Sequence, residues 1–350
     1  MYLRPGIGHP WKYQDVNPER LRQAPNIAIV GSSSPLGKEL KETLESSGFP
    51  TGKLSLLETE EYAGLLQEFA GEIRITQIIS PSAFADSDIV FFACSPEIIE
   101  AYASSGSAFP ELTIDLTQTA REGTLFLKGV SDPGLLRGAG YYLNPHPAAI
   151  ALGRVLARLQ SVFALESASV TILDPASERG SAAIDELQEQ TVELLNFQPV
   201  ASRMFKGQLA FNLLSEMETA RRTEGLVRQQ LSALMGKGMP PAAIAAIQAP
   251  VFHSHAFSVF LRLKDEASVD QIAGSLRDGG SGVTVHDEEG LAPSPVTVVG
   301  SDVVHVVRIM TDPALPGSCF LWIVADNLRI AASNAIQMAE SLMLAPASPR

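Results

Sequence analysis

The 350-residue sequence contains few cysteines and no long apolar run. Its two cysteines, Cys94 and Cys319, lie far apart without a CxxC pair, so we expect neither a disulfide framework nor a structural zinc site. No apolar stretch approaches the roughly 20 residues that a membrane-spanning helix needs. These absences predict a protein of the reducing cytoplasm with no membrane segment.

Positive charge is also scarce. Lys and Arg number 26 against 39 Asp and Glu, which gives a formal net charge of −13. A surface of this sign repels phosphate backbones and anionic lipids, so we expect no nucleic acid and no membrane as partner. Hydrophobic residues at 45% and charged residues at 19% are typical of a globular protein, and the length predicts two domains.

Residues 26–147 alternate short apolar strands with helices. The stretch "NIAIVG" predicts a buried strand, and "GSSSPLGKELKETLESSG" predicts a turn that opens an amphipathic helix. This alternation predicts an α/β fold with a doubly wound parallel sheet. Its further strands are expected at 53–58, 87–95 and 112–117. The proline-containing residues 1–25 have no apolar signal core and predict an irregular N-terminal extension.

From residue 148 onward the strands are longer and partly alternating. The stretches 167–175, 251–264 and 301–312 predict a mixed or antiparallel sheet with one covered face, and two long helices lie between them. A last strand, "CFLWIVADN", leads into a terminal helix that we expect to return to the first domain. The predicted boundaries are 26–147, 148–325 and 326–345.

The turn after the first strand has features of a dinucleotide loop. Gly31 and Gly37 hold its outer glycine positions, whereas Ser34 stands where a middle glycine normally lets the backbone approach a pyrophosphate. The hydroxyls of Ser32, Ser33 and Ser34 are suited to a phosphate at the helix N-terminus. The alternative is a serine-rich turn that only caps its helix.

The end of the second strand bears on cofactor type. It offers Glu58, Glu60 and Glu61 and no Arg or Lys. Carboxylates repel a 2′-phosphate but accept a hydrogen bond from a free ribose hydroxyl, so the sequence favours NAD over NADP. The alternative is a solvated acidic loop with no dinucleotide.

Several segments, in order, resemble the aspartate-semialdehyde dehydrogenase family over roughly residues 26–342. They include "IAIVGSSSPLGKELKETLESSGFP", "SDIVFFACS", "TIDLTQTAR", "LNPHPAAIAL", "LAFNLLSEME", "APVFHSHAF" and "PSPVTVVGSDVVHVVRI". The resemblance implies a homodimer built from a Rossmann-type domain and a C-terminal α+β dimerisation and substrate domain. It also implies a small anionic or nucleotide ligand. The implied cofactor contacts are Gly31, Ser32, Ser33, Ser34, Pro35, Leu36, Gly37, Glu58, Ala93, Cys94 and Asn334.

Enzymes of this family reduce an aspartyl phosphate through a cysteine thiolate, a thioester and hydride transfer from a nicotinamide. The cysteine lies in an Asn-Pro-Asn-Cys-Ser/Thr segment at a helix N-terminus, where the helix dipole lowers its pKa. The matching residues here are Asn144, Pro145, His146, Pro147 and Ala148. Pro147 therefore stands at the nucleophile position and has no nucleophilic atom.

Other family positions are partly retained. His255 matches the acid/base histidine, and Arg121 matches the arginine that holds the substrate phosphate. Asp174 stands at the position of a glutamine that orients the thioester. Gln248 stands at the position of an arginine that grips the substrate carboxylate, so a charge-assisted pair is lost. The segment around Asn334 is shorter than the family's and lacks its lysine and glycine.

These changes leave three hypotheses. The leading one is a fold-retaining member without thioester chemistry, acting in binding or regulation with NAD or with no cofactor. The second is an active NAD(P)-dependent oxidoreductase of amino-acid biosynthesis with an altered site. Cys94, at the carboxyl edge of the sheet, is a candidate replacement nucleophile whose alternative is a small buried apolar residue, and Cys319 is a weaker candidate. The third is a metal-dependent hydrolase, because two imidazoles and a carboxylate suit a divalent metal. Its expected ligands are His146, Asp174 and His255, with His253 and Asp132 nearby.

Overall fold

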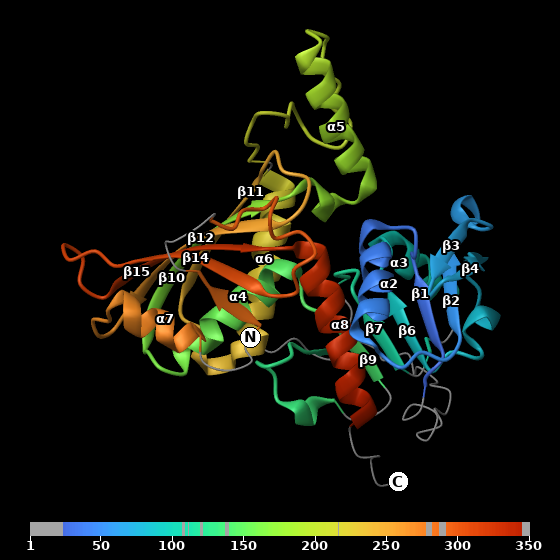
Figure 1. The fold of residues 1–350 in the computed structure, drawn as a ribbon, viewed down its shortest axis with the longest axis horizontal. Coiled ribbons are helices and arrows are strands. Elements are labelled where there is room, and N and C mark those ends of the chain that lie inside the picture. Colours follow the sequence, from blue (N-terminus) through green and yellow to red (C-terminus); the bar gives the residue numbers. More distant parts are fainter. Residues whose placement is uncertain are drawn as a thin grey trace.

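The computed structural model describes residues 24–106, 109–110, 112–119, 122–136, 140–215, 217–277, 282–286 and 292–344. Two sheets, each with its own helices, lie side by side, and the long helix α8 (Asn327–Leu344) lies between them (Figure 1). None of the described helices is long and apolar enough to span a bilayer.

The N-terminal sheet is entirely parallel. Its strand order is β5-β2-β1-β6-β7-β9-β8, and every pairing in it is parallel. The strands β1 and β6 are buried along their whole length, as their apolar sequences predict. The predicted doubly wound sheet is therefore confirmed. The strands are β1 (Ile27–Val30), β2 (Leu54–Glu58), β5 (Gln77–Ile78), β6 (Ile89–Phe92), β7 (Leu112–Asp115), β8 (Thr124–Leu125) and β9 (Gly140–Leu143).

Helices cover both faces of this sheet. One face packs against α2 (Pro35–Ser47) and α8, through Leu40 of α2 and Ile336 of α8. The other face packs against α3 (Pro96–Ser104) through Ile99 and Tyr102. A two-stranded hairpin, β3 (Leu66–Phe69) and β4 (Glu72–Ile75), stands apart from the main sheet. Single 3₁₀ turns lie at Glu60–Tyr62, Pro81–Phe84 and Pro133–Leu135.

The C-terminal sheet is mixed, as predicted. Its order is β11-β10-β12-β15-β14-β13, with two parallel pairings at β10–β11 and β13–β14 and antiparallel pairings elsewhere. One face is buried against α4, α6 and α7, through residues such as Ile150, Leu231 and Ile272. The strands are β10 (Leu165–Asp174), β11 (Ala242–Gln248), β12 (His255–Leu263), β13 (Val283–Val285), β14 (Val304–Met310) and β15 (Ser318–Ala325). The helices are α4 (Pro147–Gln160), α5 (Ser181–Leu195), α6 (Met217–Met235) and α7 (Val269–Arg277), with 3₁₀ turns at Ala176–Arg179 (η4) and Gly236–Gly238 (η5).

Two of the predicted strands of the C-terminal sheet begin later than expected. The stretch 251–264 becomes a strand only at His255, because Ser254 has a φ of 73° and a left-handed residue cannot lie in an extended strand. The stretch 301–312 becomes a strand at Val304, after Gly300 turns the chain at a φ of 81°. The late start of β12 places His255 at its first position.

The first turn of α8 ties the two domains together. Asp326 caps it by accepting hydrogen bonds from the backbone N–H groups of Leu328 and Arg329. Arg329 then reaches α2, where its Nε lies 3.0 Å from a carboxylate oxygen of Glu39 and its Nη1 donates to Thr43 Oγ1 at 2.7 Å. The residue between the cap and this contact, Asn327, faces the cluster described next.

Candidate active site

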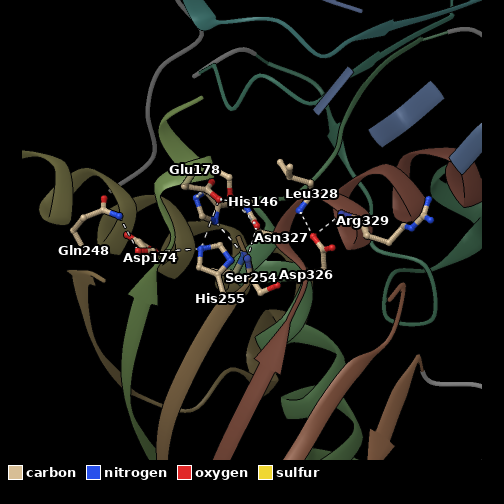
Figure 2. Close-up of polar contacts among 12 residues, drawn as sticks. His146, Asp174, Glu178, Gln248, Ser254, His255, Asp326, Asn327, Leu328 and Arg329 are labelled. Carbon is tan, nitrogen blue, oxygen red and sulfur yellow. Dashed lines mark hydrogen bonds and ion pairs between the residues drawn. The ribbon is translucent and has the colours of Figure 1, made fainter. Parts of the chain in front are cut away.

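Four ionisable side chains meet near the start of α4, at the edge of the C-terminal sheet where β10 ends and β12 begins. They are His146 at the N-cap of α4, Asp174 at the end of β10, Glu178 in η4 and His255 at the start of β12 (Figure 2). We call these four residues the histidine cluster. The two imidazole centroids are 5.9 Å apart, and the His255 side chain is fully buried.

Three polar atoms of His146 make contacts in the histidine cluster and at the start of α4. Its Nε2 lies 2.9 Å from Glu178 Oε1, and its Nδ1 accepts the backbone N–H of Ala148 at 3.1 Å. Its own backbone N–H donates to Gln230 Oε1 at 2.7 Å. The imidazole therefore acts as an N-cap, a role that Ser, Thr, Asp and Asn usually fill. Because the cap requires an unprotonated Nδ1, the hydrogen faces Glu178 from Nε2 in the neutral ring.

Glu178 bridges the two histidines. Its Oε2 lies 3.6 Å from His255 Nε2 and accepts a hydrogen bond from Asn327 Nδ2 at 3.1 Å. Burial raises the pKa of this carboxyl, but the opposing contacts with His146, His255 and Asn327 outweigh it and bring the pKa to about 2. Glu178 is therefore an anion at neutral pH.

The pKa of His146 moves in the opposite direction. Burial lowers it, yet the carboxylates of Glu178 and Asp174 outweigh burial and raise it above the ordinary value. Protonation at Nδ1 would, however, place two N–H groups face to face and remove the cap of α4. His146 therefore cannot carry a positive charge and cap α4 through Nδ1 at the same time.

The second half of the cluster is the pair of His255 and Asp174. His255 Nε2 lies 3.2 Å from Asp174 Oδ1, but neither atom makes a well-directed hydrogen bond to a described residue. Asp174 pairs in parallel register with Gln248 of β11, whose Nε2 donates to the Asp174 backbone carbonyl at 2.8 Å. The void beside Asp174 and Gln248, which Arg179 also lines, measures about 10 Å³. That is room for about one water molecule.

The structure therefore brings together the three residues that the sequence offered as candidate metal ligands, His146, Asp174 and His255. It does not bring Asp132 to them, because Asp132 caps the 3₁₀ turn Pro133–Leu135 through the Gly134 N–H at 2.8 Å. His253 precedes the left-handed Ser254 and lies outside β12, so the strand alternation that would have paired it with His255 does not apply. Arg121 lies outside the described residues.

Asn144 and Asn334 form a separate buried contact. Asn334 Nδ2 donates to Asn144 Oδ1 at 2.7 Å and to the Phe126 carbonyl at 3.1 Å, while its Oδ1 accepts the Lys128 N–H at 3.0 Å. Asn334 is fully buried. Both its amide atoms are thus bonded to protein, and the pair joins α8 to the junction before α4.

Sequence reasoning missed Glu178, Gln230 and Asn327. Glu178 lies in "DPASERG", between a buried strand and a helix that follows a glycine, where an acidic residue is typical of a solvated turn. Only its i+4 spacing from Asp174 hinted at a second carboxylate in the same place. Gln230 and Asn327 come from helices far away in the sequence, so local patterns carry no sign of their convergence.

The two cysteines are poor nucleophiles here. Burial raises the pKa of Cys94, with Asp115 adding to the effect, and burial raises the pKa of Cys319 to about 12. A thiol must ionise to attack a carbonyl, so neither residue supplies a thiolate at neutral pH.

A metal centre is not supported either. Across the described ranges, no group of three His, Cys, Asp or Glu side chains is arranged to hold a metal ion. In the histidine cluster the Nδ1 of His146 faces a backbone N–H, and its Nε2 faces a carboxylate. Both nitrogens of His146 are therefore engaged within the protein, and neither offers a free lone pair for metal ligation.

The loop after β1 has the close packing that a dinucleotide loop needs. Gly31 has a φ of 81°, and a Cβ there would lie 2.7 Å from the Cys94 Cα; a Cβ at Gly37 would lie 2.1 Å from the Gly31 carbonyl oxygen. Ser34 caps α2 through the Gly37 N–H at 2.9 Å and donates to the Ala93 carbonyl at 2.7 Å. The loop thus brings its backbone against the end of β6, at the N-terminus of α2.

Glu58 is buried beneath this loop and not in solvent. Its Oε1 accepts hydrogen bonds from the Ser32 hydroxyl at 3.1 Å and from the Ser33 N–H. Gln67 donates to the hydroxyls of both serines. The serine hydroxyls are therefore partly engaged within the protein, whereas Glu60 and Glu61 are exposed.

Replacing Glu178 by Gln should lower stability and change its pH dependence. The contribution of His146 to the free energy of unfolding is fully present below pH 6.5 and is lost as the pH rises through the raised pKa of the folded state. The contribution of Glu178 is fully present above pH 4.5 and is lost as the pH falls toward 2. The wild-type free energy of unfolding from urea titrations should thus peak between these values. E178Q should lose about 3 kcal/mol there.

The exposed Glu166 provides the control, since E166Q removes a surface carboxylate that lies 4.0 Å from Arg262. This control should change the free energy of unfolding by less than about 1 kcal/mol. An E178Q protein that keeps the wild-type pH profile would show that Glu178 does not bridge the histidines.

Comparison with known proteins finds matches to one family in both halves of the chain. Residues 26–130 match the semialdehyde dehydrogenase NAD binding domain, and residues 156–330 match the semialdehyde dehydrogenase dimerisation domain. The chain is 30% identical to a USG-1 protein homolog of Pseudomonas aeruginosa (92% of this chain, 99% of the relative) and 28% identical to the aspartate-semialdehyde dehydrogenase of Bacillus subtilis (91% and 97%). The crystal structure of aspartate semialdehyde dehydrogenase II from Vibrio cholerae superposes with a TM-score of 0.83 at 26% identity, over 92% of this chain and 99% of that one. The chain belongs to the semialdehyde dehydrogenase family.

Proposed function

We propose that this chain is a dinucleotide-binding homodimer of the cytoplasm that retains the semialdehyde dehydrogenase fold and performs no thioester chemistry. Its role is then one of binding or regulation. The observation that carries the proposal is the start of α4, where Pro147 occupies the first helical position and the histidine cluster fills the space around it. Proline there is structurally favourable, because the missing N–H would have no partner within the helix.

The loss of chemistry rests on three features beside Pro147. Both cysteines hold their protons at neutral pH, so no other thiolate replaces the missing one. Gln248 turns its amide to the Asp174 carbonyl and offers no positive charge to a carboxylate. Asp174 adds a negative charge where an acyl phosphate would lie, and the void beside it holds no more than a water.

Dinucleotide binding rests on the loop between β1 and α2. Its two glycines are held where side chains would collide, and the positive end of α2 faces the loop. Glu60 and Glu61 are exposed and Glu58 lies beneath the loop, so the region at the end of β2 is acidic, which disfavours a 2′-phosphate. We therefore assign NAD as the preferred cofactor.

Turnover measurement tests the catalytic part of the proposal. Purified chain is mixed with aspartate semialdehyde, phosphate and NAD or NADP, and reduction of the cofactor is followed by absorbance. We expect no rate above that of heat-denatured chain. A rate that survives replacement of Cys94 and Cys319 by Ala, yet disappears with H255A, would establish an active oxidoreductase with altered chemistry.

Calorimetric titration tests the cofactor. NAD should bind at least about tenfold more tightly than NADP, a difference of about 1.4 kcal/mol. G31A should abolish binding, because its Cβ would collide with Cys94, whereas G48A should not, because it adds a Cβ in open space at a similar φ. Tighter binding of NADP would refute the argument from the three glutamates, and the absence of heat with either cofactor would leave the loop as scaffold.

Homodimer formation rests on the dimerisation domain and on apolar side chains that it exposes. Phe197, after α5, is 97% exposed and Phe211 is 70% exposed, and α5 stands away from the rest of the fold (Figure 1). Large exposed apolar side chains of this kind mark interaction sites. Sedimentation equilibrium should give twice the chain mass of 37.4 kDa, and F211E should shift it toward the single mass. A monomer at micromolar concentration would contradict the proposal.

A further inference from the structure

A second pair of histidines lies on the C-terminal sheet, apart from the histidine cluster. His286 follows the last residue of β13, and His305 is the second residue of β14. The Nε2 of His286 lies 2.9 Å from the Nδ1 of His305, and the Nε2 of His305 lies 2.8 Å from the hydroxyl oxygen of Ser301. One hydroxyl and two imidazoles therefore form a continuous chain of hydrogen bonds. We call Ser301, His305 and His286 the Ser301 triad.

The hydrogens of the Ser301 triad run in either of two directions when both rings are neutral. In one of them the Ser301 hydroxyl donates to His305 Nε2, and His305 Nδ1 donates to His286 Nε2. This is the order of a nucleophile, a general base and a group that orients the base. Burial and the neighbouring His286 lower the pKa of His305, so its ring is neutral at pH 7 and is able to accept a proton.

The Ser301 triad and the histidine cluster lie on opposite faces of the C-terminal sheet. Val304 and Val306, which flank His305 in β14, belong to the core that packs against the helices. Side chains alternate along a strand, so His305 points to the other face. His255 has the same orientation along β12 as Phe257, which belongs to that core. The sheet therefore separates the two groups of histidines.

The Ser301 triad is partly open to solvent, since all three side chains are half-buried. It lies at the β13 edge of the sheet. The segment that carries the exposed Phe211 lies at the opposite edge, where Leu214 forms a bridge to Gln248 of β11. A dimer formed through Phe211 would therefore leave the Ser301 triad uncovered.

The backbone on the N-terminal side of Ser301 is fixed by hydrogen bonds. The Gly300 N–H donates to Asp326 Oδ2 at 2.6 Å, and the Gly300 carbonyl accepts from Arg329 Nε at 3.0 Å. The Ser301 N–H donates to the Val298 carbonyl at 3.0 Å. Ser301 is therefore held in place by its backbone, and its hydroxyl is left to contact His305.

The surroundings of the Ser301 triad suit the acyl part of an ester. Val324, which pairs with His305, belongs to an apolar cluster against which Trp322 packs. This cluster offers apolar surface to a short acyl chain. Among the described residues, none accepts a hydrogen bond from the backbone N–H of Asp302. The N–H of the residue after a nucleophilic serine is a common donor to the oxyanion that forms in acyl transfer.

We propose that the Ser301 triad is a second reactive centre, at which Ser301 cleaves esters of short apolar acyl groups. The Ser301 oxygen bonds to the carbonyl carbon while its proton passes to His305 Nε2. The bond from that carbon to the alcohol oxygen breaks, the alcohol leaves with the proton, and the acyl group stays on Ser301. Water then attacks the acyl carbon and gives a proton to His305, which returns it to the Ser301 oxygen as the carboxylic acid leaves.

Hydrolysis of p-nitrophenyl butyrate by the full chain tests this proposal. Release of nitrophenolate is followed by absorbance, and the acylated residue is identified by peptide mass. The butyryl group should map to Ser301. S301A and H305Q should each lower the rate at least about tenfold, because they remove the nucleophile and the base. S294A is the matched control and should leave the rate unchanged, since the half-buried Ser294 contacts Thr297 and no imidazole.

The role of His286 as a positioning residue has its own test. H286L removes the acceptor for His305 Nδ1 and should lower the rate several-fold. H286Q places an amide oxygen near the position of Nε2 and should restore most of the rate. A loss in H286L that H286Q does not restore would show that His286 does not act by accepting this hydrogen bond.

Circular dichroism confirms that each variant folds. A rate that S301A retains would overturn the proposal, as would a butyryl group on another residue with Ser301 unmodified. A rate lost in H305Q but kept in S301A would assign the reaction to an imidazole alone and would also contradict it. The assay contains neither NAD nor aspartate semialdehyde, so its result is separate from the tests of the proposed function.

Discussion

The contact between His146 and Glu178 determines what the centre of this molecule is able to do. A helix N-terminus buried between two domains must satisfy its N–H groups, and here an imidazole does so. The same ring then needs a partner for its other nitrogen, which Glu178 supplies at 2.9 Å. Glu178 is held in turn by Asn327, at the start of the helix that joins the two domains. Removing any one of these groups would leave a buried polar atom unpartnered.

This arrangement explains how the junction before α4 is held with a proline at the first helical position. The Asn-Pro segment keeps the junction between β9 and α4 in shape, because Asn144 remains hydrogen-bonded to Asn334 and to the Ala331 carbonyl. His255 lies beside this junction, with its Nε2 3.2 Å from Asp174 and 3.6 Å from Glu178. The side chains around the start of α4 contact one another through these ion pairs.

The sequence predicted the architecture well because its signals were local. Four-residue apolar strands, a glycine-bounded turn and a terminal helix each leave a pattern that a short window contains. It also predicted that His146, Asp174 and His255 converge, since the family resemblance fixes where strand ends meet. It could not predict Glu178 as the bridge, because that role depends on Asn327 and His255, which are 149 and 77 positions away. The sequence also placed the start of β12 too early, because no residue in "FHSH" indicates that Ser254 has a left-handed backbone conformation.

The mass of the intact chain after incubation with aspartate semialdehyde and NAD tests the central claim most directly. Thioester chemistry must pass through an acyl group on a cysteine, and without phosphate to release it that group stays on the chain and adds to its mass. With Pro147 in place and both thiols protonated, the mass should remain that of the unmodified chain. An acyl adduct that maps to Cys94 or Cys319 would contradict the account and would show that the fold has kept its chemistry at a new residue.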